Sequence, residues 1–381
     1  MATKAFVFFA AAFLFSNYYY LYFYGFEQGV SLAPGYLSFV KVAGVCFFVM
    51  SVFEFRLKTQ LRLKELLILT FFVFSAAFFL IKRAYFEVGS DLYLNSILCF
   101  LPFAFLEVKN SSRRMLFFEA TFWVVIFQTI IDFYINYRGL SLWDNGAYVG
   151  GLGNPSSFGM LCNIVLSYLL FFRKRSWSTI ICLPIIMFAI VETKSLFSMV
   201  AMLLIFCYFF WCLSKIAWFS ITIFGGVGVS TFGWWFLPSH LKYKIFSLYS
   251  LISEGDLSGS QSIFLRFELH RKFFENLSEH FLYTVFFGYP DYYYYGVDSQ
   301  ILTYFGSFGV LLTAFFLGGV FVHLAFSSRD GSARKFYWVS SFVLCFMFFS
   351  NRIIDYYPMP LMFLLLVFGS PRREQGDASY G

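Results

Sequence analysis

The feature that most constrains this chain is a succession of long apolar segments, separated by short polar connections, along nearly the whole sequence. Crossing the hydrocarbon core of a bilayer takes about 20 apolar residues in a helix. With 60% hydrophobic and only 13% charged residues, and a mean hydropathy of +0.71, the chain cannot be covered by a water-soluble surface. The sequence therefore predicts an all-α, polytopic integral membrane protein.

About twelve membrane-spanning helices fit into this length, and the whole chain, residues 1–381, is interpreted as a single transmembrane domain. The seventh and eighth spans are separated only by Glu192-Thr193-Lys194, which we interpret as a tight hairpin at the outer surface. The predicted spans are 5–23, 36–53, 65–82, 92–107, 115–137, 156–172, 177–192, 195–213, 216–237, 298–325, 336–352 and 356–369.

The positions of lysine and arginine predict the orientation, because short cytoplasmic connections carry the positive excess. With both termini in the cytoplasm, most of the 28 basic residues fall on the cytoplasmic side. The net charge of +7 reflects this topology, so it does not indicate nucleic acid as a partner. The cytoplasmic set comprises Lys4, Arg56, Lys58, Arg62, Lys64, Lys109, Arg113, Arg114, Arg173, Lys174, Arg175, Lys215, Arg329, Arg334, Lys335, Arg372 and Arg373.

One long polar stretch, residues 239–297, interrupts the apolar pattern between the ninth and tenth predicted spans. Within it, apolar residues recur at close to helical spacing, and serines precede them as helix caps do. We expect an amphipathic helix over 261–287 that lies on the outer membrane surface. Arg266 and His270 are four residues apart and share one face of this helix. Its apolar positions are Ile263, Phe267, Phe274, Leu277 and Phe281.

Phenylalanine is unusually frequent, with 59 residues. We interpret it as lipid-facing bulk, accompanied by interfacial tyrosines such as Tyr18-Tyr19-Tyr20. A second polar stretch, 143–159, is rich in glycine and predicts a loop whose backbone approaches something closely. The alternative is a turn without a partner.

Three segments have motif-like patterns of glycine, hydroxyl and charged residues. The first begins a predicted span, the second is the hairpin between spans seven and eight, and the third extends through the large loop into span ten. They are Gly151-Leu152-Gly153-Asn154-Pro155-Ser156-Ser157-Phe158-Gly159; Thr193-Lys194-Ser195; and Ser262 to Arg266 with Gly288, Asp298-Ser299-Gln300-Ile301-Leu302 and Gly306 to Gly309.

Together with the span count and the position of the large loop, these segments resemble the O-antigen polymerase (Wzy) and O-antigen ligase family of bacterial envelope glycosyltransferases. In the hairpin, Lys194 stands where the family more often has Arg, and in shifted order. The resemblance implies a C-type glycosyltransferase-like fold in the bacterial inner membrane. It also implies that the large loop and the active site face the periplasm.

The implied reaction joins sugar chains carried on undecaprenyl diphosphate, using neither nucleotide sugars nor a metal or other cofactor. The partners would be lipid-linked oligosaccharide, as donor and acceptor, and membrane lipids, while a chain-length regulator protein is left open. We favour a polymerase, because Asp298 stands where ligases tend to carry His. The alternatives are a ligase that transfers glycan to lipid A-core, a lipid-linked oligosaccharide flippase, and a scaffold or sensor.

A lipid diphosphate leaving group concentrates negative charge, so fixed cations near it would stabilise the transition state. Arg266 matches the family pattern and is the expected clamp, since its guanidinium binds phosphate oxygens in pairs. The alternative is an ordinary ion pair with Glu268 or Glu279. Further candidates for substrate binding are Arg352, Lys194, Lys41 and Asn154; for the first two the alternative is a side chain that extends to the membrane interface.

The acceptor hydroxyl must lose its proton as the new bond forms, so a general base is expected nearby. Asp298 is the candidate by position, and the alternative is that it caps span ten. His270 is the reserve, because it shares a helical face with Arg266 and imidazole titrates near neutral pH.

Overall fold

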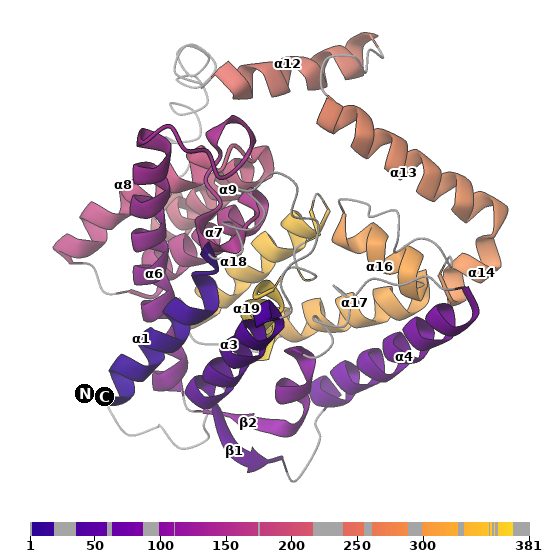
Figure 1. Ribbon diagram of the computed structural model, residues 1–381, viewed down its shortest axis with the longest axis horizontal. Helices are drawn as coiled ribbons and strands as arrows, with labels where there is room; N and C mark the ends of the chain where they lie inside the picture. Colours follow the sequence, from indigo (N-terminus) through magenta and orange to yellow (C-terminus); the bar gives the residue numbers. More distant parts are fainter. Residues whose placement is uncertain are drawn as a thin grey trace.

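The computed structural model of the protein is mostly helical (Figure 1). It describes residues 2–18, 36–58, 63–86, 99–109, 111–173, 176–215, 239–254, 261–288, 299–326, 331–349, 351–352, 354 and 357–368. The helices are α1 (Ala2–Phe15), α3 (Tyr36–Val52), α4 (Leu63–Phe86), α6 (Ser111–Tyr137), α7 (Pro155–Phe171), α8 (Trp177–Glu192), α9 (Leu196–Leu213), α12 (Ser239–Glu254), α13 (Gln261–Glu279), α14 (Phe281–Phe286), α16 (Gln300–Phe308), α17 (Val310–Phe326), α18 (Gly331–Phe348) and α19 (Met359–Phe368).

Three helices of the described part are long and apolar enough to cross a membrane. They are Glu65–Ala84 within α4, Ser112–Tyr137 within α6, and Leu196–Leu213, which is α9. Further apolar helices of 10–17 residues accompany them, among them α1, α7, α8 and α19. The predicted mainly helical fold is therefore confirmed, with apolar helices that are compatible with membrane insertion. Predicted span 216–237 lies outside the described residues.

A short two-stranded antiparallel sheet corrects the all-α prediction. Strand β1 (Phe53–Leu57) pairs antiparallel with β2 (Leu106–Val108), with Phe53 opposite Val108 and Glu54 opposite Glu107. Both strands were predicted as span ends or as a short connection. Because the helices on either side stop at these charged residues, their backbone groups pair with each other in a ladder.

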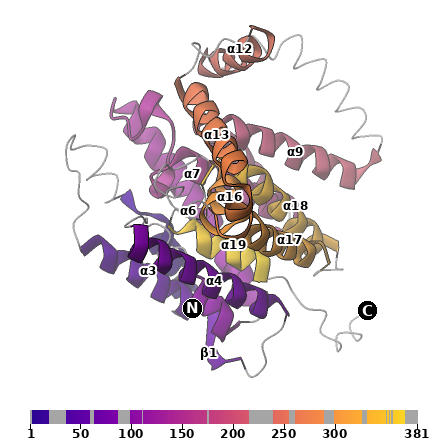
Figure 2. The same ribbon diagram turned by 90° about the vertical axis from the view of Figure 1, so that its right-hand side faces the viewer.

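The molecule has a strand end, which carries β1 and β2, and a loop end, which carries the segment 138–154 between α6 and α7 (Figure 1). In both ribbon views β1 and α12 lie at opposite extremes of the molecule (Figures 1 and 2).

Helix α7 lies at the centre of the bundle, against α6, α8, α9 and α18. Every side chain from Ser157 to Leu169 is buried, as expected for a helix that is apolar on all sides. The amide of Asn163 donates to the carbonyl oxygens of Gly159, over 2.8 Å, and of Ser198 in α9, over 2.9 Å. These bonds satisfy the side-chain donor inside the bundle and tie α7 to α9.

Phenylalanine forms much of the interior, which corrects its interpretation as lipid-facing bulk. Phe48 of α3 is fully buried and packs edge-to-face on Phe117 of α6, with ring centroids 5.2 Å apart. Phe71 of α4 is stacked on Phe316 of α17 at 4.0 Å. Other rings, such as Phe39 and Phe133, are exposed. Phenylalanine therefore serves both the interior and the outer surface of the bundle.

The predicted tenth span, 298–325, is two helices in the structure. Gly309 separates α16 from α17 with a φ of 89°, a conformation that favours glycine. A Cβ atom at this position would lie 2.6 Å from the carbonyl oxygen of Phe286 in α14. The break thus brings α14 against the joint between α16 and α17.

The segment between the predicted spans nine and ten contains three described helices, α12, α13 and α14 (Figure 2). The helix predicted over 261–287 is divided at His280, whose φ of −123° and ψ of 44° are not helical. Its apolar face also differs from the prediction. Phe273 is buried against Leu302 and Phe305 of α16, whereas Phe267 and Phe274 are exposed.

Candidate functional site

The turn between α8 and α9 contacts the segment 138–154 at the loop end. The amide of Tyr148 donates to the carbonyl oxygen of Glu192 over 2.9 Å, and Nζ of Lys194 donates to the carbonyl oxygen of Asn145. Lys194 and Asn145 have φ values of 54° and 58°, which are uncommon outside glycine and often mark tight turns or functional sites. The hairpin predicted here is present and is joined directly to the glycine-rich loop.

The glycines of the first motif exclude side chains at close contacts. A Cβ atom on Gly151 would lie 2.5 Å from Cα of Ser16 and would clash with the carbonyl oxygen of Phe15. One on Gly159 would clash with the side chain of Ser198 in α9. The close approach predicted for this segment is confirmed, and what it approaches is the protein itself.

Asn154, a predicted substrate-binding residue, caps α7. Its Oδ1 accepts from the amides of Ser156 and Ser157 over 2.8 and 3.1 Å, and Pro155 follows at the first helical position. This is the usual chemistry of a helix start. The capping role comes from the structure, while a role in binding substrate stays a prediction.

Sequence reasoning missed Asp132, a buried carboxylate near the end of α6. Its Oδ2 accepts from the amides of Val149 and Gly150 over 2.9 and 2.7 Å, and its Oδ1 accepts from the hydroxyl of Tyr18 over 3.4 Å. Asp132 therefore anchors the glycine-rich loop to α6. The available signal was a lone acidic residue in an apolar helix, which is costly unless it has partners.

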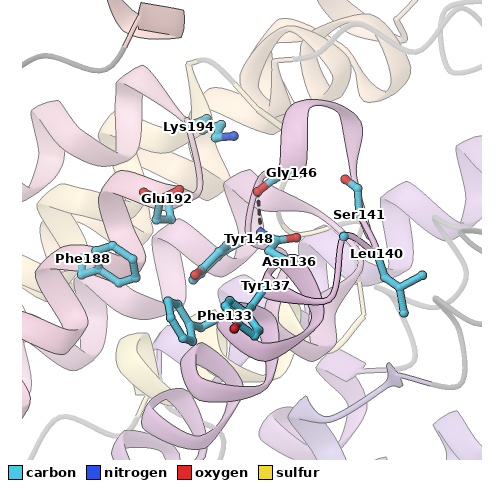
Figure 3. Close-up of a pocket in the computed structure, with 11 residues that line it drawn as sticks. Phe133, Asn136, Tyr137, Leu140, Ser141, Gly146, Tyr148, Phe188, Glu192 and Lys194 are labelled. Atoms are coloured by element: carbon cyan, nitrogen blue, oxygen red, sulfur yellow. Dashed lines mark hydrogen bonds between the residues drawn. The ribbon is translucent and has the colours of Figure 1, made fainter.

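A pocket of about 460 Å³ lies between α6, α8 and the segment 138–154 (Figure 3). Glu192 lies at one side of the pocket and Ser141 at the other, with Tyr148 and Asn136 between them (Figure 3). Lys194 also contributes to the lining. The pocket thus offers a carboxylate, an ammonium, an amide and three hydroxyl groups.

Tyr148 is nearly fully buried at the base of this pocket. Burial, together with the nearby carboxylates of Glu192 and Asp132, raises the pKa of its phenol to about 12. The hydroxyl is therefore protonated at neutral pH. Tyr148 can donate a hydrogen bond to a bound molecule, but it is not available as a general base.

A second group of predicted residues lies where α16 begins. Oγ of Ser299 accepts from the amide of Leu302 over 3.4 Å, as the cap of α16, and donates to the carbonyl oxygen of Phe348 over 3.2 Å. Ser299, and not Asp298, is therefore the cap. Asp298 lies outside the described residues, so its predicted role as general base stays a prediction.

Arg352 lies beside this helix start. The amide of Gln300 donates to the carbonyl oxygen of Asn351 over 3.3 Å, and Oε1 of Gln300 accepts from the amide of Ile354 over 2.9 Å. Arg352 is placed between these two contacts in the sequence. The structure thus brings Ser299-Gln300 and Arg352 into one neighbourhood.

Lys41 is half-buried on α3. Gly44, three residues later, leaves no room for a side chain because the hydroxyl of Tyr357 lies against it. Tyr357 follows Arg352 in the connection from α18 to α19. Lys41 therefore lies within one helical turn of a contact with that connection, although its predicted role in binding diphosphate is not tested by this contact.

Arg266 and His270 both lie on α13. The side chain of Arg266 is outside the described part, and that of His270 is half-buried. Glu268, considered as an ion-pair partner for Arg266, pairs with Arg271 over 2.8 Å. Helix α13 rests on α16 through Phe273, so the backbone of both predicted residues is carried by the helix that packs beside the motif at 299–300.

The two neighbourhoods are linked through α9 and α18. The ring of Phe197, three residues after Lys194, lies 5.3 Å from the ring of Phe346, six residues before Arg352. Among the described residues, no group of three His, Cys, Asp or Glu side chains could hold a metal ion. No protein-family model matches this chain, and comparison with curated proteins gives no match.

Proposed function

We propose that this protein is a membrane-embedded glycosyltransferase that polymerises sugar units carried on undecaprenyl diphosphate, as in the synthesis of bacterial O-antigen. The observation that carries the proposal is the meeting of the glycine-rich motif at 151–159 with the hairpin at 193–195. A Cβ atom on Gly159 would lie 3.3 Å from Oγ1 of Thr193 in that hairpin, and Tyr148, three residues before the motif, bonds to Glu192 just before the hairpin. Motif segments that act on one substrate must converge in this way.

In the proposed orientation the loop end faces the periplasm of a Gram-negative bacterium and both termini lie in the cytoplasm. About twelve helices cross the inner membrane, and residues 239–297 form the large periplasmic loop. The charge distribution supports this orientation, because basic residues lie at the strand end. Arg56 lies in β1, Lys58 directly follows β1, and Lys109 directly follows β2. Basic residues favour the cytoplasmic side.

The proposed reaction forms one bond and breaks one. The acceptor hydroxyl oxygen bonds to the anomeric carbon of the donor sugar while the bond from that carbon to the diphosphate oxygen breaks. The electron pair leaves with the diphosphate, and the hydroxyl proton passes to a base. Asp298 is the proposed base, with His270 in reserve.

Cations stabilise the departing diphosphate in this proposal. Arg266 on α13 is the principal clamp, and Arg352, Lys194 and Lys41 are further candidates. A guanidinium binds two phosphate oxygens at once and stays charged at all relevant pH values. Such a contact strengthens as charge develops in the transition state, so it lowers the barrier rather than merely tightening binding.

The decisive experiment on the function is deletion of the gene, followed by analysis of the glycolipid ladder and of the lipid-linked sugars. A polymerase predicts lipid A-core that carries a single repeat unit. Full-length polymer retained on the lipid carrier would instead identify a ligase, which shares the donor but not the acceptor. An unchanged ladder would contradict both.

Arg266→Ala should reduce chain growth by about 100-fold or more, the scale of losing one strong transition-state contact. Arg271→Ala is the matched control, because Arg271 lies on the same helix in an exposed ion pair with Glu268 and such pairs contribute little. Arg266→Lys should restore activity only in part. Normal polymer from Arg266→Ala, at wild-type protein levels, would remove the clamp from the proposal.

A further inference from the structure

We infer that the pocket between α6, α8 and the segment 138–154 binds the acceptor saccharide through stacking on its aromatic walls. This inference rests on the proposed function and adds to it a location for the acceptor, in which Lys194 serves the acceptor and no longer the diphosphate. It draws on residues that none of the motif segments contains, apart from Lys194.

Two pairs of aromatic rings form the walls of the pocket. On α6, the rings of Phe133 and Tyr137 are nearly parallel, with an interplanar angle of 16° and centroids 6.5 Å apart. Across the pocket, Tyr148 and Phe188 meet edge-to-face at 5.9 Å. The faces of sugar rings carry several C–H groups that pack well on aromatic rings, whose faces are negative. The accessible Phe133–Tyr137 pair suits such a ligand, since the two rings are 55% and 79% exposed.

Polar groups line the same pocket, where sugar hydroxyl groups need partners (Figure 3). Asn136 donates from Nδ2 to the carbonyl oxygen of Gly146 over 2.8 Å, so the loop holds this amide in place and leaves its oxygen to accept. The hydroxyl of Tyr148 is a donor, and Glu192 supplies two acceptor oxygens. An aromatic lining with a few fixed polar groups is typical of small-molecule sites, and about 460 Å³ is within their usual range.

The charges of the pocket favour the acceptor over the donor. Glu192 and Lys194 both line the pocket, so a diphosphate would meet a carboxylate as well as an ammonium. An uncharged saccharide avoids that repulsion and can accept from Lys194 while donating to Glu192. The polar lining also distinguishes these aromatic residues from interfacial anchors, which face lipid headgroups without a pocket.

Two tyrosines of the same helix provide a matched test. Tyr137 lines the pocket and Tyr134 does not, yet both are exposed on α6, at 79% and 59%. The probe is the lipid-free oligosaccharide repeat unit, released by mild acid from the lipid-linked sugars of the source bacterium. Its affinity is measured on the full-length protein in nanodiscs by titration with saturation-transfer NMR.

We expect Tyr137→Ala to weaken binding at least fivefold and Glu192→Gln at least threefold, while Tyr134→Ala stays within twofold of wild type. Equal affinity for Tyr137→Ala and wild type, or no binding by the wild-type protein, would overturn the inference. If both tyrosine variants weaken binding equally, the rings act as membrane anchors and the inference is also wrong.

The same variants separate failure of this inference from failure of the proposed function. Normal chain growth by Tyr137→Ala in a strain whose ladder depends on this gene would leave the polymerase standing and remove the acceptor pocket. Weakened saccharide binding by Tyr137→Ala, in a strain whose ladder is unchanged by gene deletion, would retain the pocket and remove the polymerase.

Discussion

The residue type at position 151 is determined by the backbone that packs against it. The backbone of Phe15 and Ser16, at the end of α1, occupies the space of a side chain, so residue identity here follows from packing between two segments of backbone. Asp132 acts on the same loop from the other side, because its carboxylate holds the amides of Val149 and Gly150. The shape of the pocket thus depends on residues that do not line it.

Gly151→Ala should lower the free energy of unfolding by about 1–3 kcal/mol, because backbone cannot turn away from the added methyl group. Gly318→Ala is the control. Nothing lies within 4 Å of a Cβ atom at Gly318, and alanine is the better helix former. Thermal unfolding in detergent tests the pair, and equal midpoints for the two variants would contradict the packing of Gly151 against α1.

At this scale the sequence indicated that the glycine-rich segment makes close contacts, since glycine has few other uses in such density. It could not indicate the partner, because α1 is more than a hundred residues away along the chain. The role of Asp132 was hidden for a related reason. Its partners are backbone amides, which leave no residue-type signature in the sequence.

The packing contact between α13 and α16 determines the position of the helix that carries Arg266, the predicted clamp. Phe273 is 2% exposed against α16, while the neighbouring Phe274 is 58% exposed. Adjacent positions on a helix point about 100° apart, so one phenylalanine packs and the next does not. The position of Arg266 on α13 therefore depends on the contact made by Phe273.

Phe273→Ala should detach α13 from α16, since removing a buried phenylalanine typically costs about 3–5 kcal/mol. Phe274→Ala removes the same side chain from an exposed position and should change little. Limited proteolysis and hydrogen exchange over 261–279 report the release. Equal protection in the two variants would show that this helix is held by other contacts.

Helix type was predictable for most elements from apolar segment length, and the hairpin at 192–195 from its charges. The positions at which helices are interrupted were less predictable. Gly309 in the predicted span 298–325 and His280 in the predicted helix 261–287 end helices through tertiary contacts or backbone geometry that periodicity does not reveal. The two-stranded sheet was missed because Phe53 and Leu106 extend apolar helical patterns up to charged residues, where pairing between β1 and β2 replaces the helix.

The whole molecule has a basic strand end, which carries β1 and β2, and a loop end that carries the candidate site. Apolar composition predicted the membrane class, but not which side of each helix meets lipid, because lipid and neighbouring helices are equally apolar. For that reason the phenylalanines were assigned to lipid, although Phe48 and Phe117 are fully buried.

Single cysteines test the proposed orientation. Ser141→Cys at the loop end should react with a membrane-impermeant maleimide in intact spheroplasts, because this side is proposed to face outward. Arg56→Cys in strand β1 should react only after the membrane is permeabilised. The wild-type chain, with its own seven cysteines, sets the background. Labelling of Arg56→Cys without permeabilisation would invert the topology.

Asp132 also bears on how the protein is made. An ionised carboxylate in an apolar helix hinders its release from the insertion machinery into lipid unless partners are at hand. The hydroxyl of Tyr18 precedes Asp132 in the chain, and the amides of Val149 and Gly150 follow it by 17 and 18 residues. All three partners therefore precede α7 in the chain and are synthesised before it. The first half of the chain can bury this charge by itself, without waiting for the second half.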